Sequence, residues 1–155
     1  MKRPDQDRFD LFAVPFERMD QALQAFALEK NFELNRNVNR QPGRVLRKRG
    51  NPHYLIDIAL EQYWLKVEYR DDLPLAVTAV AYYEPEQPTE NHLVYRIDKV
   101  VAQNETFSAL LPKLHSYLNE ALFAIEGWTP EVICRDGKSQ ENLRKKFGTG
   151  SLGDT

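Results

Sequence analysis

The stretch HYLIDIALEQYWLKVEYR, residues 53–70, contains two runs in which apolar and polar residues alternate. Because side chains on a strand point to opposite faces in turn, each run predicts a β-strand with one apolar face. A two-residue turn at residues 61–62 would join the runs as a hairpin in which Ile56 faces Val67. Glu-Gln is not the Asn-Gly that such turns prefer, so a longer loop is the alternative. Either way, the pattern predicts an antiparallel sheet as the scaffold.

Two helices are predicted to flank this sheet in the sequence. Pro15 suits the first turn of a helix that runs to about Lys30. Its apolar stripe consists of Phe16, Met19, Leu23, Phe26 and Ala27. A second, longer helix capped by Asn104 or Thr106 is predicted to end at Gly127. Its stripe consists of Phe107, Leu110, Leu111, Leu114, Leu118, Leu122 and Ile125. Pro112 falls inside this stripe, so we expect it to kink the helix or delay its start.

Further strands are predicted on both sides of the hairpin. Residues 44–49 read as a short edge strand, and residues 75–83 are apolar on both faces, as expected of a central strand. Residues 92–102 predict another strand. Residues 132–134 predict a short strand near the C-terminus, followed by a short helix capped by Ser139.

Together these elements predict an α+β fold. An antiparallel β-meander of four to five strands would pack against the N-terminal helix and the longer C-terminal helix, as a two-layer sandwich. We expect residues 1–147 to form this single domain. Residues 148–155 are small and polar, and they predict a disordered tail.

Composition restricts the class of protein. The chain has 155 residues, 21 lysines and arginines, and 23 acidic residues, so its net charge of −2 argues against a general nucleic-acid binder. The single cysteine, Cys134, cannot form an internal disulfide, which fits a reducing compartment. The chain shows no signal peptide and no apolar window long enough for a bilayer. These features predict a soluble cytoplasmic protein that does not bind membranes.

The usual catalytic motifs are absent from the sequence. It contains no glycine-rich phosphate loop, no Gly-x-Ser-x-Gly, no Cys-x-x-Cys and no His-x-x-x-His. Its three histidines, His53, His92 and His115, are too far apart for the sequence to assemble them into a metal site. We therefore predict no metal and no cofactor, and favour a protein that is not an enzyme.

One alternative is a small-ligand site or active site on the polar face of the hairpin. Its candidate residues are His53, Asp57, Glu68 and Arg70. Two carboxylates on one face can push their pKa values apart, as acid/base catalysis requires. However, Lys66 is predicted opposite Asp57, and alternating charges across strands are typical of a solvated face. The structural interpretation is therefore favoured.

A basic segment supports a further alternative. Six cations and no anions occur between Asn35 and Gly50: Arg36, Arg40, Arg44, Arg47, Lys48 and Arg49. Such a cluster can bind an anionic partner. Cations on an edge strand also discourage strand addition between molecules, and this interpretation is the favoured one.

The leading hypothesis is a non-enzymatic protein-binding domain that associates with a protein partner, including a second copy of itself. Trp64 falls on the polar side of the hairpin, where Leu55, Val77 and Ala79 would make the second face of the sheet partly apolar. Exposed apolar patches of this kind usually mark an interaction site. The alternative is that another segment of the chain covers this face.

Overall fold

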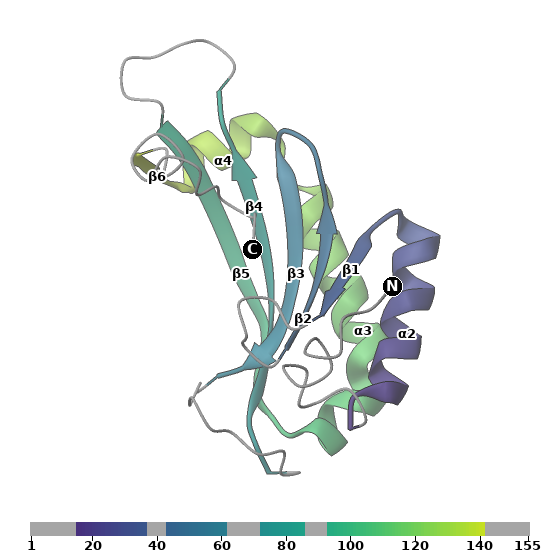
Figure 1. The fold of residues 1–155 in the computed structure, drawn as a ribbon. Coiled ribbons are helices and arrows are strands. Elements are labelled where there is room, and N and C mark those ends of the chain that lie inside the picture. The colour runs from purple at the N-terminus through teal and green to yellow at the C-terminus, as the bar shows by residue number, and fades with distance from the viewer. Residues whose placement is uncertain (1–14, 37–42, 62–71, 86–92, 142–155) are drawn as a thin grey trace, which may run out of the picture.

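The computed structural model describes residues 15–36, 43–61, 72–85 and 93–141. The predicted tail at residues 148–155 lies outside the described residues. In chain order the elements are α2 (Glu17–Lys30), β1 (Glu33–Arg36), β2 (Gly43–Lys48), β3 (His53–Leu60), β4 (Leu75–Tyr83), β5 (Leu93–Glu105), α3 (Phe107–Glu126), α4 (Pro130–Asp136) and β6 (Lys138–Glu141) (Figure 1).

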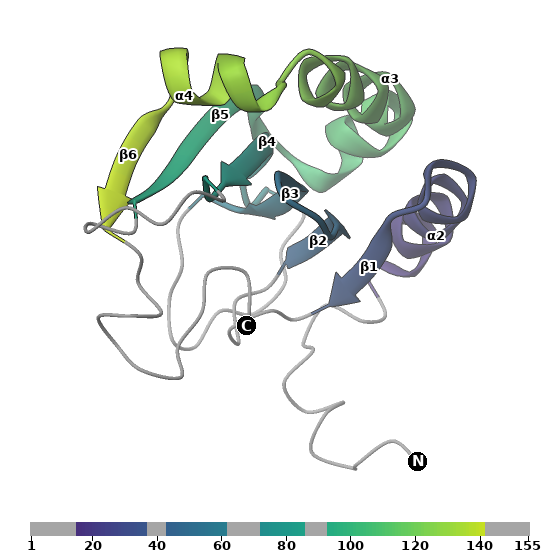
Figure 2. The same ribbon diagram turned by 90° about the horizontal axis from the view of Figure 1, so that it is seen from above.

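The strands form one antiparallel sheet in the order β1-β2-β3-β4-β5-β6. The predicted α+β class and antiparallel meander are therefore confirmed, with six strands in the described residues instead of four to five. A third helix, α4, joins the two that were predicted. Figure 2 shows all three of these helices on the same side of the curved sheet.

Strand β3 is confirmed, but its neighbours differ from the prediction. It pairs with β2 along one edge and with β4 along the other, so Ile56 faces Leu46 and Ala79. Both edges are occupied, and the predicted direct pairing of Ile56 with Val67 is therefore wrong. Alternation specifies the face on which a side chain lies, but it does not specify the neighbouring strand. Residues 62–71 lie outside the described residues.

Three smaller predictions are also wrong. Strand β2 is not an edge strand, because β1 pairs with it on the side away from β3. Residues 132–134 are part of helix α4, which Thr129 caps by accepting a hydrogen bond from the Val132 amide at 3.3 Å, with Pro130 at the first turn. Ser139 lies in strand β6 and does not cap a helix.

The core lies between the helices and the sheet. All five predicted stripe residues of α2 are buried, as are Leu110, Leu114, Leu118 and Ile125 of α3. The rings of Phe16 and Phe107 stack with centroids 5.2 Å apart, which joins the start of α2 to the start of α3. The spacing of the stripes therefore identified the side of each helix that faces the core.

Helix α3 begins directly after Thr106, whose side chain accepts a hydrogen bond from the Ala109 amide. Pro112 lies inside the helix and does not delay its start. Pro112 is the sixth residue of α3, so the helix lacks the backbone hydrogen bond that an N–H at this position would donate to the Ser108 carbonyl. Gly127 follows the last helical residue, as predicted.

Candidate functional site

An open groove of about 600 Å³ lies along one flank of α2 and includes Arg36, the last residue of β1. Its α2 residues recur at spacings of three and four, which places them on one side of the helix. The lining residues are Glu17, Asp20, Gln21, Gln24, Ala25, Leu28 and Arg36. A volume of this size falls within the range of ligand-binding clefts.

The turn after α2 brings the two walls of the groove together. Asn31 adopts a left-handed conformation that ends the helix, and the Phe32 amide donates to the Ala27 carbonyl at 2.9 Å. The chain then runs back as β1, so Arg36 returns to the level of Asp20. Strand β1 lies at one end of the described sheet. Among the described strands it pairs only with β2, along one of its two edges.

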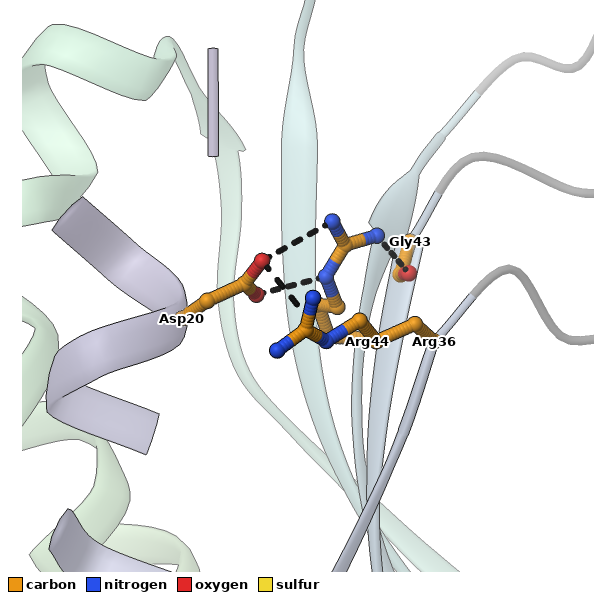
Figure 3. A network of polar contacts seen from close by, with 4 residues as sticks. All are labelled: Asp20, Arg36, Gly43 and Arg44. Atoms are coloured by element: carbon orange, nitrogen blue, oxygen red, sulfur yellow. Dashed lines mark hydrogen bonds and ion pairs between the residues drawn. The ribbon is translucent and has the colours of Figure 1, made fainter. Parts of the chain in front are cut away.

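One end of the groove contains a charged network (Figure 3). Arg44 has no exposed surface, and its Nε and Nη2 atoms donate to the Asp20 carboxylate at 2.6 and 3.1 Å. Its Nη1 atom donates to the Gly43 carbonyl at 2.8 Å. Asp20 is itself only 6% exposed. This two-bonded, charge-assisted contact ties α2 to β2 across the core.

Arg36 approaches the same carboxylate from the solvent side. Its Nε lies 3.9 Å from Asp20 Oδ2, and half of its side chain is exposed. Figure 3 shows Arg36 next to the Asp20–Arg44 pair. Because Arg44 already donates to both oxygens of Asp20, Arg36 is left with a long, weak contact.

The other end of the groove is apolar. Leu28 is 74% exposed there, next to Ala25. Between the two ends lie the amides of Gln21 and Gln24, which can each donate and accept hydrogen bonds. The groove is therefore amphipathic along its length, with cation and carboxylates at one end and a hydrocarbon surface at the other.

The face of the sheet away from the helices, the far face, includes Leu55, Asp57, Thr78 and Val80. No helix of the described residues packs on it (Figure 2). Its exposure is uneven, since Val80 is 4% exposed and Val100 is 52% exposed. Part of this face is thus withdrawn from water.

Asp57 lies near the centre of the far face, between Val45 on β2 and Thr78 on β4. Burial raises the pKa of Asp57 from its ordinary value of 3.8 to about 6, while the charge of Arg96 acts in the opposite direction. The carboxyl group is therefore protonated more easily than usual.

An aromatic and cationic row lies on the same face as Asp57, at the start of β3. His53 stacks on Tyr82 with ring centroids 5.2 Å apart, and the Arg96 guanidinium lies 5.6 Å from the Tyr82 ring centroid. Arg96 also forms an ion pair with Asp98 at 3.2 Å. Of the four candidate ligand-site residues, His53 and Asp57 share the far face, while Glu68 and Arg70 lie outside the described residues.

The residues of the predicted partner surface do not share one face. Leu55 lies on the far face opposite Val80, whereas Val77 and Ala79 are fully buried in the core opposite Ile58 and Ile56. Trp64 lies outside the described residues. The assignment of Val77 and Ala79 to the second face is wrong, because β4 is apolar on both faces and its pattern alone cannot identify the inward side.

The described members of the basic segment do not form a single cationic surface. Arg44 is buried against Asp20, and Arg47 is 5% exposed. Lys48 lies 4.9 Å from the Phe32 ring centroid, and Arg49 forms an ion pair with Glu33 at 3.3 Å. Alternation along the strand sends these cations to opposite faces. Arg36 lines the groove, and Arg40 lies outside the described residues.

Two features are absent from the residues that the structure describes. No group of three or more histidine, cysteine, aspartate or glutamate side chains in them is placed to hold a metal ion. None of their helices has the length and apolar character that crossing a membrane requires.

Sequence reasoning missed the groove, although two signals pointed to it. Asp20 interrupts the α2 core stripe one turn after Phe16, and a polar residue there needs a buried partner. Leu28 lies outside that stripe, which places a large apolar side chain on the opposite flank of the helix.

Comparison with known proteins adds no relative. No family model matches the chain, and no match was found among curated proteins or among solved structures.

Proposed function

We propose that this domain is a non-enzymatic protein-binding module, and that it binds an extended segment of a partner in the groove between α2 and β1. The observation that carries the proposal is the position of the groove. It lies along one flank of α2 and includes Arg36 of β1, and β1 is an end strand of the described sheet. We expect the helices to pack as one layer on the sheet. If a partner segment is added beside β1, its side chains on the helix side would then enter the groove.

A partner segment that is added as a strand would contact both β1 and α2. A segment that pairs with β1 would satisfy its backbone N–H and C=O groups on the strand edge. Alternate side chains of the segment would then point toward α2 and fill the groove. The α2 lining from Glu17 to Leu28 spans about 16 Å along the helix axis. This length matches about five residues of extended chain.

The apolar end of the groove supplies the main contact energy. Leu28 is 74% exposed, and covering it with an apolar side chain removes hydrocarbon surface from water. Gln21 and Gln24 can form hydrogen bonds to the segment along the middle of the groove. An apolar anchor with polar neighbours is typical of protein interaction sites.

The test is a selection of random nonapeptides displayed on phage against the immobilised full chain. Selected peptides are then synthesised and measured by fluorescence polarisation. We expect Leu28→Glu to weaken binding by about tenfold or more, because a charge replaces the apolar anchor. In the complex, hydrogen exchange of the backbone amides of Glu33–Arg36 should be slowed, because an added strand protects them.

The matched control is Phe123→Glu. Phe123 is 79% exposed on α3, so this variant also replaces an exposed apolar side chain with a charge, but outside the groove. It should bind the selected peptides as well as the unmodified chain does. The proposal fails if no peptide is selected, if both variants weaken binding equally, or if the amides of β1 are not protected.

A further inference from the structure

At the charged end of the groove, two cations, Arg44 and Arg36, contact the carboxylate of Asp20. Asp20 accepts two hydrogen bonds from Arg44, at 2.6 and 3.1 Å, which use both of its oxygens. Arg36 is the second cation at the same carboxylate, at 3.9 Å. The three side chains together carry one net positive charge, and it lies on Arg36, the exposed member of the set (Figure 3).

Arg36 is available to a ligand. Asp20 is the sole carboxylate within 4.0 Å of it in the described part of the chain. The guanidinium is half exposed and lines the groove. A planar guanidinium presents several N–H donors in a fork that matches a carboxylate, so its chemistry favours an acidic group.

Glu17 limits where that acidic group can lie. It is three residues before Asp20 on the same flank of α2, at the charged end of the groove. A ligand carboxylate would be repelled from the α2 wall at this point. It is therefore expected next to β1, where Arg36 lies.

We infer that the groove recognises an acidic extended peptide, whose carboxylate side chain pairs with Arg36 and whose apolar side chain covers Leu28. The inference rests on the proposed strand addition to β1 and specifies the partner's chemistry. Side chains at positions i, i+2 and i+4 of a strand lie on one face. The acidic and apolar residues of the partner are therefore two or four positions apart, with one or three residues between them. Arg36 distinguishes acidic peptides from neutral or basic ones, and α2 supplies most of the contact surface.

The experiment uses the selected nonapeptides and versions in which the acidic residue is changed to glutamine or lysine. For the unmodified chain we expect acidic peptides to be enriched, and the change of Glu to Gln in the peptide to weaken binding about tenfold. Arg36→Gln should cause a similar loss. Combining the two changes should cost little more than either one alone, since both remove the same contact.

Charge reversal sharpens the result. Arg36→Glu should prefer the peptide in which lysine replaces the acidic residue. Arg49→Glu is the matched control, because Arg49 is 62% exposed and pairs with Glu33 of β1 but does not line the groove. Arg49→Glu should retain the preference for the acidic peptide. Thermal unfolding of each variant verifies that it is folded.

The outcomes separate this inference from the proposed function. If peptides bind in the groove and depend on Leu28 but show no acidic preference, the inference is wrong and strand addition stands. The inference is also wrong if Arg49→Glu changes the preference as much as Arg36→Glu does. If no peptide binds, both the inference and the proposed function are wrong. If light scattering shows a dimer that Leu28→Glu abolishes, the occupant of the groove is a second copy of the chain and not a peptide.

Discussion

Asp20 lies on the helix side of the sheet and Asp57 on the far face, and both carboxyl groups are largely withdrawn from water. Arg44 donates two hydrogen bonds to Asp20, so the charge of Asp20 is matched inside the protein. Asp57 instead lies between Val45 and Thr78, and burial raises its pKa to about 6. Arg96 offsets part of this effect but does not reverse it.

The comparison shows that the partner, and not burial alone, decides how a buried carboxylate affects stability. A matched pair holds two elements together and is costly to break from one side. A carboxyl group without a close cation is more easily protonated and opposes folding when it is ionised. Three experiments test this difference and the contrast between the two faces.

The largest effect is expected from Asp20→Ala, which removes the carboxylate that accepts two hydrogen bonds from the fully buried guanidinium of Arg44. We expect the free energy of unfolding to fall by about 3–5 kcal/mol. Urea unfolding followed by circular dichroism measures this loss. The double variant Asp20→Leu with Arg44→Met removes both charges and should be far closer to the unmodified protein. A loss below about 1 kcal/mol for Asp20→Ala would contradict the assigned pair.

A second pair of variants compares the two faces of the same strand. Ile56 is fully buried on the helix side, while its neighbour Leu55 is partly exposed on the far face. Ile56→Ala should cost about 3 kcal/mol, because it opens a cavity in the core. Leu55→Ala should cost about 1 kcal/mol, because the site keeps partial contact with water. Equal losses in urea unfolding would show that the two faces are packed equally well.

Much of the helix side could be predicted because its residues follow a single period. The stripes of α2 and α3, the alternation of β3 and the cap at Thr106 each depend on neighbours within a few residues. These local rules identified the apolar face of each element. Strand β4 was also assigned with its exact bounds, residues 75–83.

The neighbours of each strand could not be predicted in the same way. The alternation of β3 fits any partner with the same period, so the pattern could not distinguish residues 63–70 from β4. The same limit explains the error at Val77 and Ala79, where both faces of the strand are apolar. Short elements such as α4 depend on the cap at Thr129, which outweighed the β-type residues Val132 and Ile133.

The groove was missed because it depends on contacts that are distant in the sequence. Arg44 read as part of a cationic run, and nothing near it identified Asp20, which is 24 residues away, as its partner. Once that pair forms, Arg36 becomes the cation that faces solvent. The role of each arginine was therefore set by folding and could not be read from their shared charge.

The last prediction concerns Asp57→Asn, for which we expect an effect of about 2 kcal/mol that depends on pH. The folded pKa of Asp57, about 6, lies above the ordinary value of 3.8. The stability from this group is therefore fully present below pH 3.8 and lost as the pH rises through 6. The difference corresponds to at most about 3 kcal/mol, and we expect about 2 kcal/mol because Asp57 keeps part of its surface in water.

Asparagine cannot ionise, so the variant does not lose this stability when the pH rises. As the pH is raised from 4 to 8, its free energy of unfolding should increase by about 2 kcal/mol relative to that of the unmodified protein. Urea unfolding at both pH values measures this gain, and any effect of the amide that does not depend on pH cancels in the comparison. Ile56→Ala is the control, since it changes no titrating group and should cost the same at both values. If Asp57→Asn behaves like that control, the carboxyl group has a partner that stabilises its charge, and the two faces treat their carboxylates alike.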